Sequence, residues 1–422
     1  MRIVFLTHYF PPEVNAPANR TYEHCREWAA AGHEVHVITC VPSHPAGRPF
    51  HGYRKRWYQR ETRDGIVVHR VWTYLAANSG VIKRTVNFLS FIPTAVWRAV
   101  RLGRGDVMIA TSPQFFCAVA GWIAAALTRT PWIFELRDLW PDSIAAVGAS
   151  RAYMPIRLLE RLELRMYRSA AAVVCVSEAF VRNLASRGID SRKLHFVPNG
   201  VDLALWTGGS RERGRRQLAI ADDALLVSYI GTIGMAHDVG TILTAASRLK
   251  ASRPDIRFAI VGDGAELPAV KARIAAEGLT NVTATGLVAR QTIPDLLAAT
   301  DLSLVTLKAS DVFKTVLPSK MFESMAASKP IVLSVDGESR RLLERAGAGV
   351  AVRPGDGDAL LASILSLAGD PDRRMAMGRA GRRFVEREFT RQHWAERYLR
   401  LIDDAIVVPA RSVSQPARAS SL

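Results

Sequence analysis

Short apolar runs, each followed by a loop and a helical pattern, recur along the chain. In the first 40 residues the pattern predicts a strand at 3–7, a helix at about 20–31 and a second strand at 34–39, because apolar residues recur at different periods in strands and helices. Further runs of strand length follow in the first half, at 65–71, 107–110, 132–135, 172–176 and 194–197. Strands that alternate with helices predict a parallel sheet covered by helices on both faces.

The same alternation starts afresh after a hydrophilic stretch rich in Gly and Arg at 207–217. Strands are predicted at 225–230, 258–261, 282–285, 302–306 and 331–333, each followed by a loop that contains Gly or Pro. The fold class is therefore α/β, with two Rossmann-like, doubly wound parallel-sheet domains. We place them at 1–205 and 206–385, followed by a terminal helix at 386–408 that packs on the domain edge and a disordered tail at 409–422.

Length and composition agree with two globular domains, because 422 residues exceed the size at which a single core usually stops growing. The formal net charge is +17, and residues 1–205 carry 26 Lys and Arg against 15 Asp and Glu. Such a field favours an anionic partner such as an acidic lipid or a phosphorylated substrate. A solvated basic surface is the alternative. No nucleic-acid-binding motif is present, so we do not expect nucleic acid as a partner.

The four cysteines, Cys25, Cys40, Cys117 and Cys175, lie far apart and form no CxxC pair, which predicts reduced, buried thiols. The apolar run at 3–6 is too short for a signal peptide, so a cytoplasmic location is expected. Residues 82–104 mix apolar residues with Lys and Arg around Pro93. Two interpretations stay open for them: an interfacial helix that holds the protein on the acidic inner face of the membrane, and an ordinary surface helix.

Two glycine-containing loops at strand ends in the second half are candidates for binding a diphosphate. Glycine lets a ligand approach the backbone closely, and amides at helix starts attract phosphate. The candidate donor-binding residues of these loops are Gly231, Thr232, Gly234, Gly262, Asp263 and Gly264. Such loops are common in α/β proteins, and simple turn formation is the alternative for each.

The most specific segment is 317–332. Pro318 and Ser319 open a helix there and expose amides that suit a phosphate, and Lys320 adds a cation. Glu323 follows about one turn later, where a carboxylate can accept both hydroxyls of a ribose. The alternative for Glu323 is a surface carboxylate favoured by the helix dipole.

This segment resembles the donor-binding signature of retaining glycosyltransferases of family 4, which have the GT-B fold with two domains facing a cleft. The resemblance extends over nearly the whole chain and includes the motifs at 11–13, 32–35, 137–141, 197–202, 261–264 and 318–330. It implies that Glu323 holds the ribose of a nucleotide sugar and that the loops at Gly231 and Gly262 approach the nucleotide.

The chain departs from that family pattern at several positions. The Glu that usually contacts the donor sugar is replaced by Thr315, and the basic residues of the first loop are replaced by Thr232 and His237. We expect Lys320, and Lys314 beside it, to supply the missing charge. The variant pattern is similar to fucosaminyltransferase-like enzymes of bacterial surface-polysaccharide assembly.

In the first half, loops after strands provide the other candidates. His8, Asn15, Asn19 and Arg20 follow the first strand and are the candidate acceptor-binding residues. Arg137 and Asp138 end another strand and, with Lys320, are the candidate catalytic residues. A structural ion pair is the alternative for Arg137 and Asp138.

The resemblance implies transfer of a sugar, with retention, from a nucleotide-sugar donor to a lipid-linked or saccharide acceptor in surface-polysaccharide synthesis. A UDP-sugar is favoured, with an N-acetylated deoxyhexosamine as a candidate sugar. No metal site is evident in the sequence, so we expect no metal and no other cofactor. The alternative function is a GT-B-fold sugar-nucleotide epimerase. A nicotinamide oxidoreductase is disfavoured because no GxGxxG motif follows the first strand.

Overall fold

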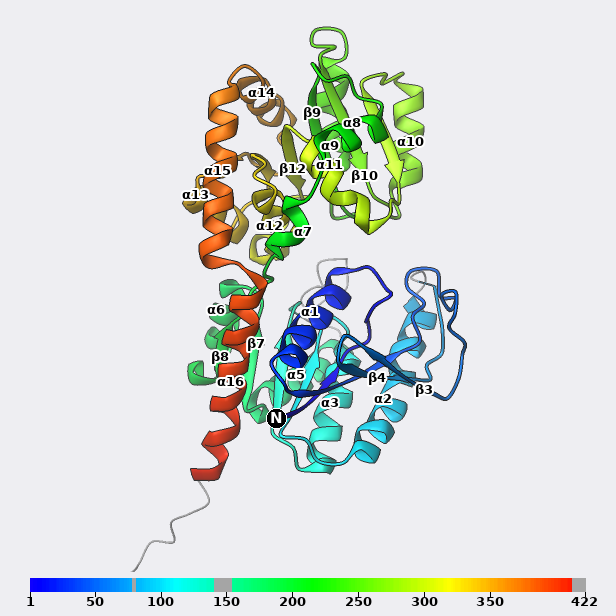
Figure 1. Cartoon of the computed structure of the whole chain (residues 1–422). Helices are drawn as coiled ribbons and strands as arrows, with labels where there is room; N and C mark the ends of the chain where they lie inside the picture. The colour runs from blue at the N-terminus through cyan, green and yellow to red at the C-terminus, as the bar shows by residue number, and fades with distance from the viewer. Residues whose placement is uncertain (78–80, 140–153, 412–422) are drawn as a thin grey trace, which may run out of the picture. The chain divides into compact units, whose positions relative to one another are not determined.

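The computed structural model describes residues 1–77, 81–139 and 154–411, and these form two compact units (Figure 1). The first unit comprises Met1–Pro198 and Gln392–Leu422, and the second comprises Asn199–Arg391. The chain therefore passes into the second unit seven residues before the predicted division at 205/206, and it returns to the first unit at Gln392. Each unit has its own sheet and its own core.

The sheet of the first unit has eight strands in the order β3-β4-β2-β1-β5-β6-β7-β8, and all pair in parallel except β3 with β4. The strands are β1 (Arg2–Leu6), β2 (Glu34–Cys40), β3 (Tyr58–Arg63), β4 (Ile66–Val71), β5 (Val107–Thr111), β6 (Trp132–Leu136), β7 (Ala172–Cys175) and β8 (Leu194–Phe196). The central strands are buried on both faces, which is why they are nearly continuous apolar runs in the sequence.

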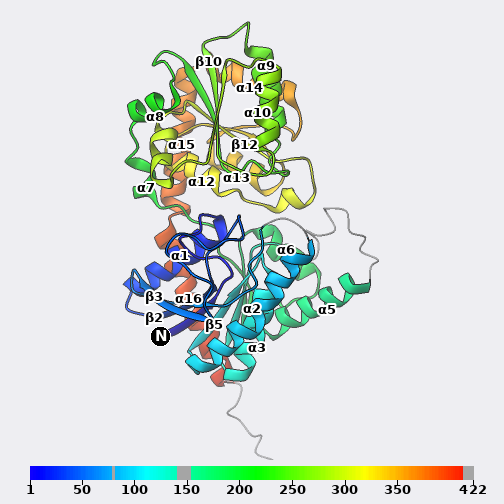
Figure 2. The same cartoon turned by 90° about the vertical axis from the view of Figure 1, so that its right-hand side faces the viewer.

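Helices cover both faces of this sheet: α1 (Ala16–Ala30), α2 (Val81–Leu102), α3 (Phe115–Thr128), α5 (Met154–Ser169), α6 (Glu178–Ser186) and α16 (Arg391–Arg411). Figure 2 shows α2 and α3 packed beside each other, and one apolar core lies beneath them. A second core lies under α1 and α16, where the Trp28 indole donates to the Ala395 carbonyl at 3.1 Å and meets the Tyr398 ring edge-on. The last helix of the chain is thus part of the core of the first unit.

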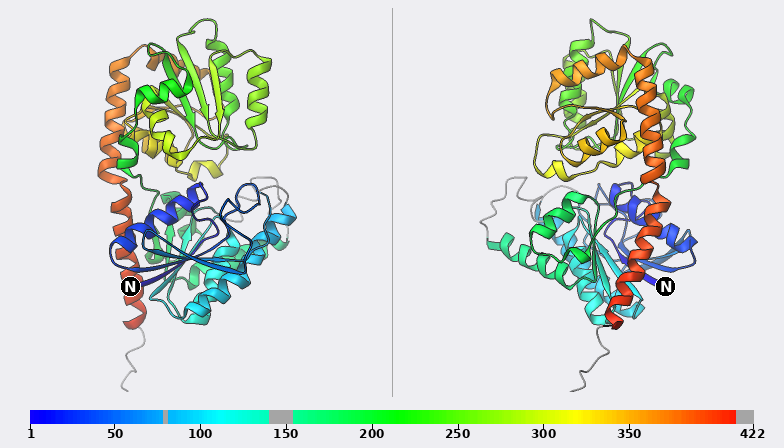
Figure 3. Two further views of the ribbon diagram at one scale, coloured as in Figure 1. Left: turned by 45° about the vertical axis from the view of Figure 1, so that its right-hand side comes forward. Right: turned by 90° about the vertical axis from the view of Figure 1, so that its left-hand side faces the viewer.

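The second unit has six parallel strands in the order β11-β10-β9-β12-β13-β14. They are β9 (Leu225–Ile230), β10 (Ile256–Val261), β11 (Val282–Gly286), β12 (Leu302–Thr306), β13 (Ile331–Ser334) and β14 (Gly349–Ala351). Helices lie on both faces of this sheet (Figure 3): α7 (Leu203–Thr207), α8 (Arg211–Leu218), α9 (Val239–Leu249), α10 (Leu267–Ala276), α11 (Ile293–Ala299), α12 (Ser319–Ala326), α13 (Glu338–Ala346), α14 (Gly357–Ala368) and α15 (Pro371–Glu388).

The predicted α/β class with two doubly wound parallel sheets is confirmed. Two strands were not predicted: β3 lies at the sheet edge and contains no aliphatic residue, and β14 is only three half-buried residues long. The hydrophilic stretch at 207–217, after which the alternation starts afresh, contains most of α8, which Ser210 caps. The expected terminal helix at 386–408 is two helices, because α15 ends at Glu388 and Thr390 pairs with Val201 before α16 begins.

The predicted tail begins inside α16, and its part at 412–422 lies outside the described residues, as do positions 140 and 141 of the motif at 137–141. All four cysteines are buried and none is in a disulfide, so their predicted burial is confirmed.

Candidate functional site

The two glycine loops of the second unit lie together at the carboxyl edge of its sheet, after the neighbouring strands β9 and β10. The Gly231 amide donates to the Val261 carbonyl at 2.9 Å, and the Ile233 amide donates to the Asp263 carbonyl at 2.9 Å. Gly262 and Gly264 have φ of 139° and 157°, a backbone conformation that favours glycine. The two loops therefore pack backbone against backbone, an arrangement that leaves no room for side chains between them.

The predicted helix with Pro318 and Ser319 at its start is α12, which follows β12 and so begins at the same edge of the sheet. Pro318 has an extended conformation (φ −62°, ψ 128°) and Ser319 is the first helical residue. Among the described residues, no side chain caps this helix start, so its first amides are available to an anion. Two hydroxyl groups, of Ser303 in β12 and Ser324 in α12, lie 2.6 Å apart and join the helix to the sheet.

Lys320 extends from the first turn of α12 across the loop after β9. Its ammonium donates to the Tyr229 hydroxyl at 2.7 Å and lies 3.9 Å from the centroid of the Tyr229 ring. A Cβ atom on Gly231 would lie only 2.9 Å from the Lys320 Nζ atom. The structure thus places the Lys320 ammonium beside Gly231, although the two were predicted from segments almost 90 residues apart.

The electrostatics of Lys320 are unusual for a lysine. Desolvation lowers its pKa to about 7, and the nearby Glu323 carboxylate opposes this shift. His237, in the loop after β9, is also desolvated, and with the repulsion of Lys320 its pKa falls to about 4. At neutral pH His237 is therefore uncharged, and Lys320 is poised between its charged and neutral forms.

Other candidates of the second unit have simpler surroundings. Glu323 is half-buried on α12, one turn after Lys320, whereas Thr232 and Asp263 are exposed. The Lys314 ammonium is exposed and pairs with Asp311 at 2.7 Å, and the Thr315 hydroxyl donates to the Val312 carbonyl at 2.7 Å. Lys314 consequently has a local partner for its charge, and Thr315 stabilises its own turn.

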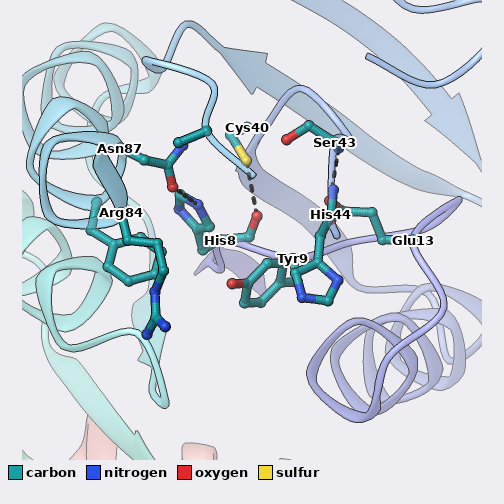
Figure 4. A pocket seen from close by; sticks show the side chains of 10 residues that line it. His8, Tyr9, Glu13, Cys40, Ser43, His44, Arg84 and Asn87 are labelled. Carbon is teal, nitrogen blue, oxygen red and sulfur yellow. Dashed lines mark hydrogen bonds between the residues drawn. The ribbon is translucent and has the colours of Figure 1, made fainter. Parts of the chain in front are cut away.

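A pocket opens at the carboxyl edge of the first sheet (Figure 4), where the loops after β1 and β2 meet α2. Its lining residues are His8, Tyr9, Glu13, Cys40, Ser43, His44, Ala76, Arg84, Asn87 and Phe88. Aromatic rings and hydrogen-bonding groups alternate in it: the His8 ring meets Tyr9 and Phe88 edge-on, and the Arg84 guanidinium lies 5.8 Å from the Phe88 ring centroid. Such a mixture suits a ligand with both apolar faces and polar groups.

His8 is the only predicted acceptor residue that lines this pocket. Its Nε2 atom lies 3.1 Å from Oδ1 of Asn87, whose amide nitrogen donates to the Tyr74 carbonyl. Asn87 therefore presents an acceptor, and Nε2 of His8 must be the donor. Burial lowers the His8 pKa to about 4, so the ring is neutral at pH 7. Its Nδ1 atom is then an acceptor, for which the described residues provide no hydrogen-bond partner.

The buried Glu13, which the sequence analysis did not select, ties the pocket loops together. Its carboxylate accepts from the backbone amides of Ser43 and His44, both at 2.9 Å, and from Phe10 at 3.3 Å. Burial raises the Glu13 pKa, and the three amides and Arg70 oppose this shift. The motif at 11–13 carried the only sequence signal for Glu13.

The remaining predicted residues of the first unit have structural contacts. Asn15 caps α1 by accepting from the Ala18 amide at 2.9 Å, and half-buried Asn19 lies in the first turn of that helix. Arg20 is buried: it pairs with Glu135 at 3.4 Å and donates to two carbonyls at 197 and 198, at 2.8 and 2.7 Å. Asn15 and Arg20 therefore make contacts that stabilise the fold, and neither is among the residues that line the pocket.

Arg137 and Asp138 follow β6 and are both half-buried. The Arg137 amide donates to the Ser112 hydroxyl at 2.7 Å, and its guanidinium donates to the Pro17 carbonyl at 3.2 Å. Burial lowers the Arg137 pKa to about 10, which still leaves it charged at neutral pH. Arg137 thus adds a fixed positive charge at the carboxyl edge of the first sheet.

Metal sites and membrane-spanning helices are the other kinds of feature to consider in the described part of the chain. Within residues 1–77, 81–139 and 154–411, no group of three His, Cys, Asp or Glu side chains is placed to hold a metal ion. Among the helices of the same ranges, none combines the length and the apolar character needed to cross a membrane.

Each of the two units matches a known protein family. Residues 15–200 match the family described as "Glycosyl transferase 4-like domain", and residues 210–384 match "Glycosyl transferases group 1". A relative from Escherichia coli (strain K12), the putative colanic acid biosynthesis glycosyl transferase WcaI, is 27% identical over 377 residues, which are 86% of this chain and 91% of WcaI. The probable glycosyltransferase WbjE of Pseudomonas aeruginosa is 26% identical over 265 residues, 62% of this chain and 65% of WbjE.

Among solved structures, Anabaena Alr3699/HepE in complex with UDP-glucose superposes with a TM-score of 0.73 at 17% sequence identity. The alignment covers 96% of this chain and 100% of that protein. At this identity the likeness establishes the fold, which is GT-B.

Proposed function

The chain belongs to family 4 of the glycosyltransferases, and on that premise we propose that it moves a sugar from a nucleotide sugar, preferably a UDP-sugar, to a lipid-linked or saccharide acceptor with retention at the anomeric carbon. The observation that carries the proposal is the contact of Lys320 with Gly231 beside the open start of α12. There one cation, two glycine loops and a helix start converge, as binding of a diphosphate requires.

The likenesses support this choice of donor and pathway. Alr3699/HepE was crystallised with UDP-glucose, and WcaI is named for colanic acid biosynthesis. A role in surface-polysaccharide synthesis, such as that of O-antigen, capsule or exopolysaccharide, follows by analogy with WcaI. An N-acetylated deoxyhexosamine is the proposed sugar, in line with the resemblance to fucosaminyltransferase-like enzymes.

In the proposed donor complex, the Glu323 carboxylate accepts hydrogen bonds from the ribose hydroxyls. Ser319 and Lys320 bind the diphosphate at the start of α12. Gly231, Gly234, Gly262 and Gly264 let the nucleotide approach the backbone. Pro318 orients the helix start, and Thr232 and Asp263 border the site from the solvent side. Glu323 lies one helical turn beyond Lys320, so ribose and diphosphate can be held at once.

In the proposed reaction, the bond between the anomeric carbon and the diphosphate oxygen breaks, and a bond from the acceptor oxygen to that carbon forms. The acceptor proton goes to the departing diphosphate, so no further reactant is required. Lys320 and the amides of α12 stabilise the negative charge that builds on the leaving group. Arg137 and Asp138 are the candidates for orienting the acceptor, and no metal or other cofactor takes part in the proposal.

The acceptor is proposed to bind in the pocket of the first unit. The Nδ1 atom of His8, which has no hydrogen-bond partner among the described residues, accepts a hydrogen bond from an acceptor hydroxyl there, and the exposed Arg84 suits a phosphate group. Arg84 lies on α2, whose neighbouring face exposes Ile82, Val86 and Leu89 with exposed fractions of 79%, 43% and 43%. An apolar face with basic neighbours favours contact with an acidic membrane surface, where a lipid-linked acceptor would be found.

The donor assignment is tested by a thermal-shift panel of UDP-, GDP- and ADP-sugars, because a ligand that binds only the folded state raises the melting temperature. We expect a UDP-sugar to stabilise the protein selectively. Glu323→Ala should abolish this shift and reduce transfer severely without lowering the melting temperature of the free protein. Glu212→Ala, an exposed carboxylate on α8, is the matched control. Unchanged donor affinity in Glu323→Ala would remove the ribose assignment.

Analysis of the reaction products distinguishes the proposed transferase from the alternative function, a sugar-nucleotide epimerase. A transferase releases the nucleotide only when an acceptor is supplied and yields a glycosylated acceptor. A GT-B-fold epimerase converts the nucleotide sugar with no acceptor present, and this outcome would replace the proposal.

A further inference from the structure

We propose that Tyr229 is a positioning residue of the diphosphate site: its hydroxyl group and ring hold the Lys320 ammonium over Gly231, where the phosphates approach. The inference rests on the proposed function and adds a residue that the donor-binding segments do not contain. Tyr229 is the penultimate residue of β9, and its side chain is fully buried.

The Tyr229 hydroxyl is fixed on both sides. It donates its single hydrogen to the Thr232 carbonyl at 2.6 Å, so only its lone pairs remain to face Lys320. The ammonium donates to that oxygen at 2.7 Å. Burial raises the Tyr229 pKa, which keeps the hydroxyl protonated throughout the neutral range. Tyr229 is therefore a neutral acceptor for the ammonium and does not compete with it for a diphosphate.

The ring provides the second constraint. The ammonium lies 3.9 Å from the ring centroid, within the range of a cation–π interaction. A lysine side chain has four rotatable bonds and loses rotamer entropy when it is held in one place. Because Tyr229 holds the ammonium before the donor arrives, less of this cost falls on donor binding and on the transition state.

The absence of a side chain at Gly231 completes the arrangement. A Cβ atom there would lie 2.9 Å from Nζ and 3.0 Å from Cε of Lys320, so glycine leaves the space that the lysine occupies. The same hydroxyl that holds Lys320 also holds the Thr232 carbonyl. Tyr229 thereby fixes the loop after β9 and the first turn of α12 relative to each other.

The titratable groups around Lys320 come from α12, from β9 and from the loop after β9. Glu323 on α12 favours the ammonium, His237 in the loop after β9 is neutral near pH 7, and Tyr229 on β9 is neutral as well. Among these three groups, the Tyr229 hydroxyl is the uncharged one that accepts a hydrogen bond from the ammonium. Its removal should therefore make the ammonium easier to deprotonate and leave the ring packing intact.

The test is Tyr229→Phe in the full chain, assayed with the UDP-sugar selected by the thermal-shift panel. We expect kcat to fall about tenfold, as for loss of one hydrogen bond to a charged group, while KM for the donor changes less. The alkaline limb of the kcat profile should move to lower pH, because the ammonium loses an acceptor that stabilises it. Tyr167→Phe, which removes a buried tyrosine hydroxyl bonded to Glu163 at 2.6 Å, should leave the profile where it is.

A double-mutant cycle with Lys320→Met decides whether Tyr229 acts through the lysine. We expect Tyr229→Phe to have no further effect on kcat in the Lys320→Met background. An equal loss in both backgrounds, or an unmoved pH profile, would overturn the positioning role and leave the proposed function intact.

Calorimetric measurement of UDP binding distinguishes failure of this inference from failure of the proposed function. Wild-type protein that binds UDP, with a Tyr229→Phe variant of unchanged kcat and pH profile, overturns only this inference. Wild-type protein that is stabilised by none of the nucleotide sugars and binds no UDP overturns the proposed function and this inference with it.

Discussion

The carbonyl oxygen of Gly231 occupies the space where a side chain of Gly262 would begin: a Cβ atom built on Gly262 lies 1.9 Å from that oxygen. Gly262 also has φ of 139°, which residues with side chains rarely adopt. A second contact between the same two loops repeats the relationship, because a Cβ atom on Gly264 would lie 2.2 Å from the Ile233 carbonyl oxygen. The two loops of the donor site are therefore held at a separation that only glycine permits.

The first prediction follows from this contact. Gly262→Ala should force the loops apart, lower the melting temperature and abolish stabilisation by UDP, because the backbone atoms in contact cannot move aside as a flexible side chain could. Differential scanning fluorimetry with and without UDP measures both effects. Gly240→Ala, on an open site within α9, is the control and should be neutral or stabilising by about 0.5–1 kcal/mol. Full UDP binding by Gly262→Ala would contradict the prediction.

The fold was predictable to the extent that strands are buried on both faces. β1, β5 and β9 are apolar runs in the sequence because helices cover both sides of each sheet. β3 lies at the sheet edge, has no fully buried residue and contains no aliphatic residue, so its sequence did not distinguish it from a loop. The return of α16 to the first unit depends on contacts such as Trp28 with Ala395, 367 residues apart, which no local pattern contains.

The donor segments were predictable because glycine spacing and a Pro-Ser helix start are local features. The partnership of Tyr229 with Lys320 was not, because the two are 91 residues apart and Tyr229 fits the pattern of an ordinary strand residue. The pocket residue Asn87 was missed for the same reason, since it meets His8 across 79 residues. The ion pair of Arg20 with Glu135 was not predictable either, because sequence gives no sign that an arginine on a helix faces a buried carboxylate.

The second prediction concerns that buried ion pair. Arg20→Met should destabilise the first unit by about 3–5 kcal/mol, because it leaves the Glu135 carboxylate buried without its cation and two carbonyls without their donor. Urea unfolding followed by fluorescence measures the loss. Arg216→Met breaks an exposed pair with Glu212 and should change stability by less than about 1 kcal/mol. A stable Arg20→Met variant with weakened acceptor binding would restore Arg20 to the acceptor site.

The third prediction is a pH dependence of UDP binding. Lys320 has a folded-state pKa of about 7, below the ordinary lysine value, and a bound diphosphate stabilises its charged form and so raises that pKa. Affinity for UDP should therefore be greatest below about pH 7 and fall by up to tenfold for each pH unit above it, until the pKa of the bound state is reached. Calorimetry between about pH 7 and pH 9 measures this slope.

Two variants assign the slope to Lys320. Lys320→Met should bind UDP weakly and without the slope, whereas Lys271→Met, which removes an exposed lysine on α10, should retain it. His237 cannot produce the slope, because its pKa of about 4 lies well below the range of the measurement. A slope that persists in Lys320→Met would show that another group titrates on binding.

The fourth prediction concerns the exposed apolar face of α2. Ile82, Val86 and Leu89 are spaced so that they share one side of the helix, and Lys83 and Arg84 are exposed beside them. If this face enters an acidic membrane surface, Ile82→Ser with Leu89→Ser should reduce binding to vesicles containing anionic lipid at least tenfold, because each side chain contributes about 1.5–3 kcal/mol when buried. Sedimentation with vesicles measures the bound fraction.

The control is Leu127→Ser, which changes the 63%-exposed Leu127 of α3 and should leave vesicle binding unchanged. Added salt should weaken the wild-type interaction by screening the basic residues. If the wild-type protein does not bind anionic vesicles, or if Leu127→Ser loses as much binding as the α2 variant, α2 is an ordinary surface helix. A soluble saccharide would then be favoured as the acceptor.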